Sequence, residues 1–240
     1  MIIQPSKDPL GLACLDYING IEQGEILVRS NITEDDSIPA DYLFRSFDQM
    51  PELEQQALKL CKGRTLDVGA GSGTHSLYLQ KKGIDVTSLD ASPNACRVCQ
   101  IQGIQNVINE DFFDVNLDDK YDTILMMMNG IGISGTLQGL DQLFAKAKEL
   151  LAPGGQLLID SSDIRYMFID DTNPLIPEPE GPYYGEVTYQ MEYKDITCVP
   201  FKWLFIDPIL LNYRADANGF NFEKMGEGTH YDFLARLTLK

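Results

Sequence analysis

The segment Leu66-Asp67-Val68-Gly69-Ala70-Gly71-Ser72-Gly73 places a short apolar run directly before three alternating glycines. Residues 75–82 follow with a helical pattern that stops at Gly83. Glycines at such a strand-to-helix turn let the backbone bend tightly and let a ligand approach where a Cβ would block it. Asp90 ends the next predicted strand, 21 residues after Gly69. A carboxylate at that place can accept both hydroxyls of a ribose.

Strands and helices alternate on both sides of this segment. Five buried strands interleaved with helices predict an α/β fold, in which right-handed crossovers make the sheet parallel and cover both of its faces. The predicted strands are 64–68, 86–89, 107–108, 123–128 and 156–160, the predicted helices are 51–60, 75–82, 93–102, 136–151 and 208–217, and residues 221–225 and 231–239 form a closing antiparallel pair.

The charge of the chain argues against a nucleic-acid partner. Its 240 residues include 19 Lys and Arg against 36 Asp and Glu, a formal net charge of −17, which repels a polyanion. No apolar run approaches the roughly 20 residues that a bilayer requires, and no secretion signal is recognisable, so we expect a cytoplasmic protein without a membrane partner. Five cysteines include Cys96 and Cys99, but no second pair completes a metal site, so no metal is predicted.

The glycine segment resembles the first motif of class I S-adenosylmethionine-dependent methyltransferases, with its G-x-G-x-G spacing and an acid before the glycines. Further motifs of that family follow in order across residues 50–163: Ser88-Leu89-Asp90-Ala91-Ser92, Asn109-Glu110-Asp111-Phe112, Met128-Asn129-Gly130 and Leu151-Ala152-Pro153-Gly154-Gly155. The resemblance implies a Rossmann-like methyltransferase fold, with a mostly parallel seven-stranded sheet and helices on both faces.

The resemblance also implies that S-adenosyl-L-methionine is the cofactor. By similarity, Asp90 would bind the ribose, Asp111 the adenine amino group and Phe112 the adenine ring. The acids complement a ligand that carries a sulfonium and an ammonium group. The other residues that we expect at the cofactor are Asp67, Gly69, Ala70, Gly71 and Gly73 for its methionine part, with His75, Ala91, Met128, Asn129, Tyr42 and Arg45 around it.

Three of these residues have structural alternatives. His75 begins the helix after the glycines and can equally bond to the loop. Tyr42 and Arg45 can fold over the cofactor, where Arg45 would pair with its carboxylate, or can simply pack the amino-terminal region onto the sheet.

Methyl transfer needs alignment and exclusion of water more than it needs catalytic groups. A general base is required only when the acceptor must lose a proton. Because ligands bind at the carboxyl ends of parallel strands, the catalytic candidates are Asn129, Asp160 and Asp163.

The acceptor is expected to be a small molecule. Residues 129–132 read Asn-Gly-Ile-Gly, which departs from the Asn/Asp-Pro-Pro-Tyr signature of nucleic-acid base methylation, and no Pro-Cys nucleophile follows that strand. Two other functions remain open at this point: a nicotinamide-dependent oxidoreductase that uses the same crevice, and a module that binds S-adenosylmethionine without turnover.

We expect one domain over residues 1–240. It divides into a helical amino-terminal cap (1–62), a cofactor-binding core (63–163), an inserted loop and hairpin that acts as a lid (164–207), and a closing helix with antiparallel strands (208–240). The inserted segment is rich in aromatic residues, so its alternative role is an interface with a second copy of the chain. The aromatics expected to wall the acceptor are Tyr183, Tyr184, Tyr189, Tyr193 and Trp203.

Overall fold

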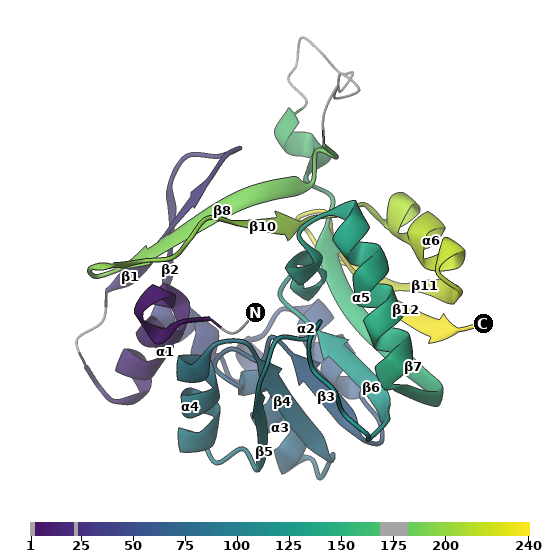
Figure 1. Cartoon of the computed structure of the whole chain (residues 1–240), viewed down its shortest axis with the longest axis horizontal. Helices are drawn as coiled ribbons and strands as arrows, with labels where there is room; N and C mark the ends of the chain where they lie inside the picture. Colours follow the sequence, from purple (N-terminus) through teal and green to yellow (C-terminus); the bar gives the residue numbers. More distant parts are fainter. Residues whose placement is uncertain (1–2, 22–23, 169–181) are drawn as a thin grey trace.

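A seven-stranded sheet forms the centre of the computed structural model, which describes residues 3–21, 24–168 and 182–240. Its strand order is β11-β12-β7-β6-β3-β4-β5 (Figure 1). The five strands β3 to β7 run parallel, and β12 pairs antiparallel with both β7 and β11. The strands are β3 (Thr65–Val68), β4 (Val86–Asp90), β5 (Asn106–Asn109), β6 (Tyr121–Met126), β7 (Leu151–Ser162), β11 (Phe220–Glu227) and β12 (Asp232–Leu239). The predicted mostly parallel seven-stranded sheet is confirmed.

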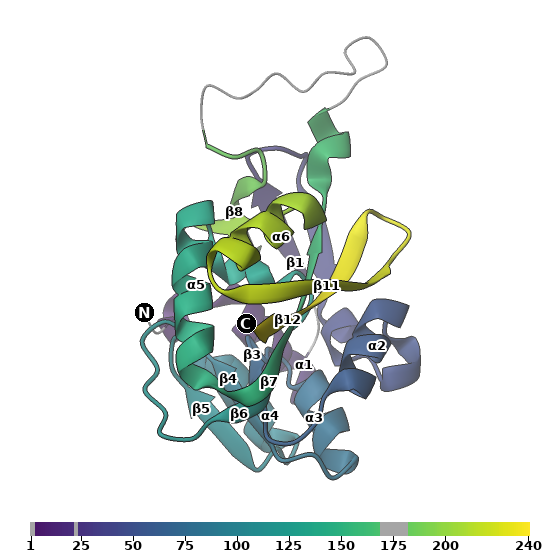
Figure 2. The ribbon, with the colours of Figure 1, turned by 90° about the vertical axis from the view of Figure 1, so that its right-hand side faces the viewer.

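Helices cover both faces of this sheet, as the sequence predicts. Figure 2 shows α2 and α3 on one side and α5 and α6 on the other. Leu125 packs toward α2 and α3, whereas its neighbour Ile124 packs toward α5, because successive strand residues point to opposite faces. The helices are α1 (Pro9–Ile18), α2 (Glu52–Leu60), α3 (Thr74–Lys81), α4 (Pro93–Ile101), α5 (Leu137–Leu150) and α6 (Pro208–Ala217), with short 3-10 turns η1 (Pro5–Lys7), η2 (Ala40–Phe44), η3 (Phe47–Gln49), η4 (Gly130–Ser134) and η5 (Ile164–Phe168). None of the helices in these ranges is long and apolar enough to cross a membrane.

The helices start at residues that satisfy their free N–H groups. Ser92 begins α4 and Thr136 begins α5, each accepting a backbone N–H with its side-chain oxygen, and Asp207 does the same for two N–H groups of α6. At the other ends, Lys59, Lys81 and Lys148 lie in the last turns of α2, α3 and α5. Cations there interact favourably with the partial negative charge of the helix carboxyl end.

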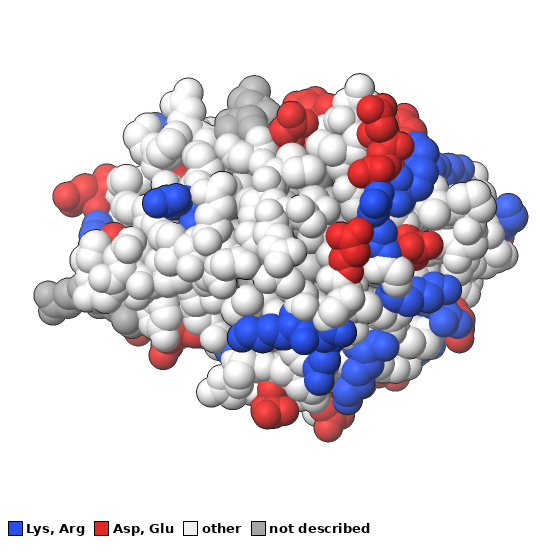
Figure 3. All heavy atoms as spheres, turned by 90° about the horizontal axis from the view of Figure 1, so that it is seen from below, with Lys and Arg blue, Asp and Glu red and all other residues white. Residues whose placement is uncertain are grey.

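Because α2, α3, α4 and α5 run antiparallel to the parallel strands, their carboxyl ends lie at the lower end of the molecule (Figure 1). Seen from below, Lys and Arg side chains gather over one part of that surface (Figure 3). The carboxyl ends of the parallel strands lie at the opposite, upper end (Figure 1).

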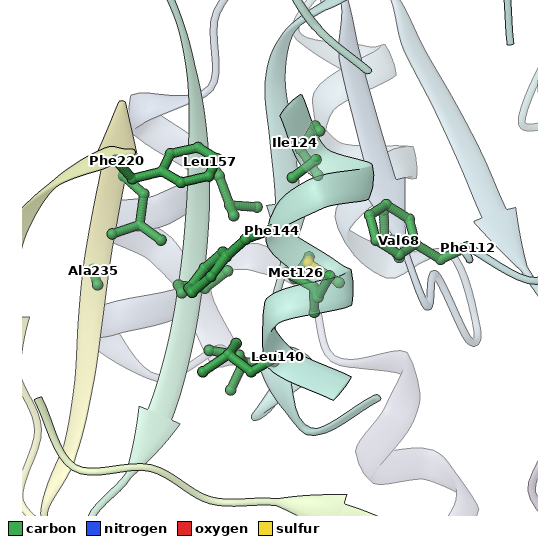
Figure 4. Packing of buried hydrophobic residues seen from close by; sticks show 14 of the residues in the cluster. Val68, Phe112, Ile124, Met126, Leu140, Phe144, Leu157, Phe220 and Ala235 are labelled. Atoms are coloured by element: carbon green, nitrogen blue, oxygen red, sulfur yellow. The ribbon is translucent and has the colours of Figure 1, made fainter. Parts of the chain in front are cut away.

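The largest of the four hydrophobic clusters in the described residues lies between the sheet and α5. Phe144 of α5 is fully buried and its ring centroid lies 5.4 Å from that of Phe220 on β11. Figure 4 shows Leu140 and Phe144 extending from α5 toward the strand β7 of Leu157, with Met126 of β6 behind the helix. This packing holds the carboxyl ends of β6 and β7 in place.

The amino-terminal cap is not purely helical, which corrects the expectation for residues 1–62. A second, antiparallel sheet combines this region with the inserted hairpin in the order β10-β8-β1-β2, with β9 beside β8. Arg29 of β1 lies opposite Gln190 of β8, so the cap and the insertion share one sheet that crosses the upper end of the molecule with α1 beneath it (Figure 1). Its strands are β1 (Glu25–Ser30), β2 (Asp36–Pro39), β8 (Glu186–Tyr193), β9 (Ile196–Thr197) and β10 (Phe201–Leu204).

Two contacts attach the second sheet to the first. Trp203 of β10 lies directly over Gly132 of η4, where an added Cβ would stand only 1.9 Å from the indole nitrogen Nε1. Glu186 of β8 accepts the N–H of Leu137 at 3.1 Å, at the start of α5. The proline-rich loop predicted between Pro174 and Pro182 lies outside the described residues, except for Pro182 itself.

Candidate functional site

The glycine loop leaves open space above β3. Gly69 and Gly71 have φ angles of +69° and +56°, and an added Cβ would meet no atom within 4 Å at Gly69 and only a carbonyl oxygen, at 3.9 Å, at Gly71. Gly73 differs, because its Cβ would lie 2.5 Å from Ile104 Cδ1 and 2.8 Å from Cys99 Sγ. Two glycines therefore border free space, while the third allows α4 to pack closely against the loop.

Asp90 closes this loop from the neighbouring strand. One carboxylate oxygen accepts the Gly71 N–H at 2.8 Å and the other accepts the Ser92 N–H at 2.8 Å. Burial raises the pKa of Asp90 to about 6, although these two hydrogen bonds favour the charged form. The carboxylate thus lies at the carboxyl end of β4 beside the open glycines, where the sequence predicts a ribose; that role stays a prediction.

Other predicted cofactor residues lie beneath the loop. The Asp67 side chain is buried and accepts a hydrogen bond from Ser76 Oγ at 2.7 Å, so it supports the first turn of α3. Phe112 is 4% exposed and belongs to the core cluster with Val68, which leaves little of its ring for an adenine (Figure 4). Ala70 is buried against Cys99 and Ile104, and the Asp111 carboxylate accepts the Phe113 N–H at 2.9 Å.

The amino-terminal region covers the loop. The carbonyl oxygen of Leu43 in η2 accepts hydrogen bonds from Ser72 Oγ at 2.5 Å and Thr74 Oγ1 at 2.9 Å. Near β4, the Ile3 N–H donates to the Ala91 carbonyl at 2.9 Å. Residues far apart in the sequence therefore enclose the carboxyl ends of β3 and β4.

A pocket of about 240 Å³ opens at the carboxyl ends of β6 and β7, and β6 is the sheet neighbour of β3, which leads into the glycine loop. Asp160 of β7 and Asp232 of β12 form one wall, and the amino-terminal end of α2 forms another. The lining residues are Tyr42, Pro51, Leu53, Glu54, Met128, Asn129, Asp160 and Asp232. Four of them, Tyr42, Met128, Asn129 and Asp160, are sequence-predicted site residues.

The turn after β6 adopts an unusual backbone. The sequence predicts a strand through Met128, but β6 ends at Met126, and both Met128 and Asn129 have positive φ angles, 63° and 54°. Non-glycine residues adopt this region at a cost, and such strain clusters at functional sites. Asp160 accepts the Gly130 N–H at 3.3 Å, and Ser162 Oγ donates to Asn129 Oδ1 at 3.1 Å, so β7 holds the turn.

An ion-paired cluster lies at the α2 side of the pocket. Glu54 Oε1 lies 2.7 Å from Arg45 Nη2 and its Oε2 lies 2.9 Å from His75 Nε2. Burial opposes ionisation of Glu54, but His75 and Arg45 outweigh it and lower the pKa of Glu54. Burial likewise opposes the charge on His75, but the hydrogen bond to Glu54 and the nearby acids raise the pKa of His75. The Arg45 guanidinium stacks over the Tyr42 ring at 3.8 Å.

Two of the hydrogen-bond donors of Arg45, Nε and Nη1, are not used within the described residues. Its side chain is only 10% exposed, yet Nε and Nη1 are buried without a hydrogen-bond partner in the described part of the chain. Unpaired buried donors are costly, so a guanidinium in this state is prepared for an anion.

Asp160 and Asp163, both predicted as catalytic candidates, do not share a site. Asp160 and Ser162 face α2, whereas Asp163 faces the other way and accepts hydrogen bonds from Tyr184 OH and the Arg165 N–H, both at 3.0 Å. Asp163 directly follows the end of β7, and its partners Tyr184 and Arg165 also contact Asp207 at the start of α6. Burial raises the pKa of Asp160 to about 7.

The aromatic residues of the insertion do not wall this pocket. Tyr183 and Tyr184 both donate to Asp207 Oδ2, at 3.0 and 3.4 Å, at the start of α6. Tyr193 is fully buried and donates to Asp16 of α1 at 3.2 Å. Trp203 packs on Gly132, as described above. These side chains join the second sheet to the rest of the molecule.

The sequence analysis missed four of the pocket residues, Pro51, Leu53, Glu54 and Asp232, of which Glu54 and Asp232 are charged. The sequence pattern of α2 could have identified Glu54, because this acid shares the buried face of the helix with Leu53, Ala57 and Leu58. A buried acid needs a partner, which indicates a polar site there. No sequence pattern identifies Asp232, because its position depends on the pairing of β12 with β7.

The comparisons with known proteins agree with this geometry. Residues 65–155 match the family model described as a methyltransferase domain. A solved structure of a SAM-dependent methyltransferase from Bacteroides fragilis, in complex with S-adenosyl-L-homocysteine, is 43% identical in sequence. It superposes with a TM-score of 0.93 over 100% of this chain and 98% of that one.

Curated relatives match over a shorter range. The putative methyltransferase YqeM of Bacillus subtilis is 28% identical over 119 residues, which cover 46% of this chain and 48% of YqeM. A ubiquinone biosynthesis O-methyltransferase of Xanthomonas oryzae is 24% identical over 107 residues, 43% of this chain and 45% of that protein. The chain thus spans about half the length of these curated relatives.

Proposed function

The chain belongs to the S-adenosylmethionine-dependent methyltransferases, and on that premise we propose that it transfers the methyl group of S-adenosyl-L-methionine to a small-molecule acceptor. The observation that carries the proposal is the adjacency of two half-sites at one end of the sheet. The open glycines with Asp90 form one half, and the pocket at Asn129 and Asp160 forms the other. The pocket alone, at about 240 Å³, falls below the usual size range of ligand sites, so it accommodates only part of a cofactor and acceptor pair.

The residues present fit the cofactor at both of its ends. Gly69 and Gly71 leave space for a close approach, and Asp90 stands beside them for the ribose hydroxyls. The unpaired Nε and Nη1 of Arg45 would bind the carboxylate of the amino-acid end. When bound, S-adenosylmethionine supplies a methyl group already activated by its sulfonium.

The protein's own contribution is positioning. The strained turn at Met128 and Asn129 directs an exposed Met128 side chain and the Asn129 amide to the pocket, while β7 keeps the turn fixed. The contacts of Leu43 with Ser72 and Thr74 hold the cap over the loop and exclude water there. Alignment and exclusion of water are what an in-line displacement requires.

The acceptor is proposed to be small because the net charge of −17 and the pocket volume both disfavour a nucleic-acid substrate. The O-methyltransferase named above shares only 45% of its own length with this chain, so its acceptor does not carry over.

Titration calorimetry with S-adenosylmethionine, its demethylated product and NAD tests the cofactor. We expect clear binding of the first two and none of comparable strength for NAD; preferential binding of NAD would instead support the oxidoreductase. Asp90→Ala should weaken binding by about 1.5–3 kcal/mol, the range for a hydrogen bond to a charged group. Asp85→Ala is the matched control, because Asp85 is an exposed acid that directly precedes the other end of β4.

Arg45→Gln separates the two interpretations of the cap. If Arg45 binds the cofactor carboxylate, the variant should lose affinity while keeping the circular dichroism spectrum of the parent. Unchanged affinity would leave Arg45 with the structural role of holding Glu54. A screen of small acceptors that detects the demethylated cofactor then distinguishes an enzyme from a binding module without turnover.

A further inference from the structure

The amino-terminal arm places a buried acid beside the ribose half of the candidate site. Asp8 is only 3% exposed and lies outside residues 50–163, the range of the family motifs. Its Oδ1 accepts the Gly11 N–H at 2.9 Å, which caps α1. Its Oδ2 accepts hydrogen bonds from Ser92 Oγ at 2.5 Å and from Asn94 Nδ2 at 3.0 Å. One carboxylate therefore joins the start of α1 to the turn between β4 and α4.

This position requires a carboxylate, not merely a helix cap. Ser or Asn caps a helix about as well as Asp does. At Asp8, however, two donors meet at Oδ2 while a third bonds to Oδ1, and an ionised carboxylate accepts on both oxygens. An amide would turn its own NH2 group toward two donors. The three hydrogen bonds also satisfy a charge that would otherwise be costly to bury. Asp8 therefore serves the turn after β4 as well as α1.

The arm and the turn approach each other closely. At Gly11, an added Cβ would lie 2.2 Å from Asp8 Oδ2 and 2.4 Å from Ser92 Oγ, so a glycine is needed for α1 to come this near. Next to this contact, the Ile3 N–H donates to the Ala91 carbonyl at 2.9 Å. Figure 1 shows α1 beside α4. Asp8 and Ser92, which are 84 residues apart in the sequence, thus meet at the carboxyl end of β4.

A chain of hydrogen bonds continues from Ser92 to Asp90. The Ser92 N–H donates to Asp90 Oδ1 and the Gly71 N–H donates to Oδ2, both at 2.8 Å. An ionised carboxylate has about four acceptor positions, two on each oxygen, so within the described residues one position on each oxygen stays free. Two free positions match the two hydroxyls of a ribose if the plane of the carboxylate is fixed. Gly71 fixes one oxygen, Ser92 fixes the other, and Asp8 holds Ser92.

We infer that Asp8 is a positioning residue for the cofactor, which acts through Ser92 to hold the Asp90 carboxylate in the orientation that binds both ribose hydroxyls. The inference rests on the proposed function and extends its ribose subsite into the amino-terminal arm. Without the Asp8 carboxylate, the turn at Ser92 is free to shift, so Asp90 keeps its charge but loses its fixed plane. Small errors in the placement of a binding group are costly. The loss is confined to the ribose contacts, because the other parts of the cofactor are bound by other residues.

Two ligands that differ by one ribose hydroxyl test this role. S-adenosyl-L-homocysteine and its 2′-deoxyribose analogue are each titrated by calorimetry into the parent and the variants. We expect the parent to bind the ribose ligand about ten- to a hundredfold more tightly, the range for a hydrogen bond to a charged group. In Asp8→Asn, which keeps the size of the side chain, this preference should fall below about threefold. A merely structural role of Asp8 would weaken both ligands equally and leave the preference unchanged.

Asp16→Asn is the matched control on the same helix. Asp16 is also a buried acid of α1, but it accepts hydrogen bonds from Tyr193 OH at 3.2 Å and Lys194 Nζ at 2.5 Å, on the side of the second sheet. The variant should therefore keep the ribose preference of the parent. An equal loss of the preference in Asp16→Asn and Asp8→Asn would show that a general loosening of α1 is the cause, which contradicts the inference.

Ser92→Ala tests the route from Asp8 to Asp90. The variant lacks the hydroxyl that binds Asp8, so it should lose the ribose preference to the same extent as Asp8→Asn. The double variant should lose no more, because both changes remove one link. Additive losses would show that Asp8 does not act through Ser92. Denaturant unfolding checks that each variant is folded, and Ser92→Ala provides the test on its own if Asp8→Asn is not.

The parent protein separates the two levels of the argument. Failure of S-adenosyl-L-homocysteine to bind would contradict the proposed function, and the inference with it. Tight binding of both ligands without a ribose preference, or a full preference in Asp8→Asn, would overturn the inference and leave the proposed function standing.

Discussion

Single residues in the glycine loop have different tasks although their backbone angles are similar. Gly69 and Gly73 have φ angles of +69° and +83°, but only Gly73 is in close contact, with Ile104 and Cys99 of the α4 region. The first borders the space in which we place the cofactor. The second allows α4 to approach the loop. The two glycines therefore allow stability and binding to be tested separately.

Alanine at these two positions should give opposite patterns. In both variants, alanine in a left-handed backbone should lower the free energy of unfolding by about 1–2 kcal/mol. Gly73→Ala should lower it by about 1–3 kcal/mol more, because the new Cβ overpacks the contact with Ile104 and Cys99. Gly69→Ala should show only the backbone cost but bind the cofactor more weakly, because its Cβ enters free space beside the ligand. Urea unfolding and calorimetry measure both quantities. A larger loss of stability in Gly69→Ala would contradict the assignment.

Asp160 also makes stability depend on pH. Its pKa is about 7 in the folded protein and near 4 in the unfolded chain, so the folded state binds more protons between these values. The contribution of the protonated Asp160 side chain to the free energy of unfolding is therefore fully present below about pH 4, and it is lost as the pH rises through 7. The free energy of unfolding of the parent should fall between pH 4 and 8, and in Asp160→Asn this fall should be smaller by about 1–3 kcal/mol. Each unit of pKa shift corresponds to about 1.4 kcal/mol, and screening by solvent reduces the effect of the shift. Denaturant unfolding at several pH values measures this, and an identical pH dependence in both proteins would refute it.

At the scale of elements, one of the contacts that attach the second sheet to the first also bears on the pocket. Trp203 of β10 rests on Gly132 of η4, and η4 directly follows the strained turn at Asn129. The docking of β10 thus supports the turn that lines the pocket, although neither Gly132 nor Trp203 lies in it.

Gly132→Ala should displace β10. The new Cβ would stand 1.9 Å from Trp203 Nε1, so the indole must move, at a cost of about 1–3 kcal/mol. Trp203 is the single tryptophan of the chain, so a red shift of the emission spectrum reports its exposure directly. Gly24→Ala is the control, because its Cβ would make an ordinary contact of 3.5 Å with Tyr193. Parent-like emission and stability in Gly132→Ala would show that the contact is not needed.

At the scale of the whole molecule, charge is unevenly distributed. Lys and Arg side chains gather over one part of the lower surface (Figure 3), and the last turns of α2, α3 and α5 each contain a lysine. The acids of the candidate site lie at the upper end. With a net charge of −17, the field favours a cationic ligand at the upper end.

Salt should therefore affect the cofactor and its product differently. S-adenosylmethionine carries one more positive charge than its demethylated product, so its relative affinity should fall several-fold between about 0.02 and 0.5 M salt, as the screening length shortens to a few ångströms. Calorimetry at several salt concentrations gives this ratio. Lys81→Ala, at the lower end, should leave it unchanged. A ratio that is independent of salt would show that the long-range field plays no part.

The sequence alone determined the half of the site that is built from neighbouring elements. The loop from Gly69 to Gly73, the strand that ends at Asp90 and the alternation of strands and helices all follow from short segments joined by local turns. The closing pair β11 and β12 was also predictable, because only a short turn separates its strands. In each case the hydrophobic period and the turn residues specify the structure before any distant contact forms.

Only the tertiary structure decided the other half. Pairing of β1 with β8 joins segments about 160 residues apart, and no local pattern identifies such a partner. Burial placed Phe112 in the core and Asp67 beneath the loop, and hydrogen bonds from Tyr184 and Arg165 hold Asp163 away from Asp160. The pocket brings Glu54 and Asp232 together because α2 and β12 pack against the same end of the sheet. Contacts between distant segments depend on the packed fold as a whole, and the side chains that share a site are chosen by that packing.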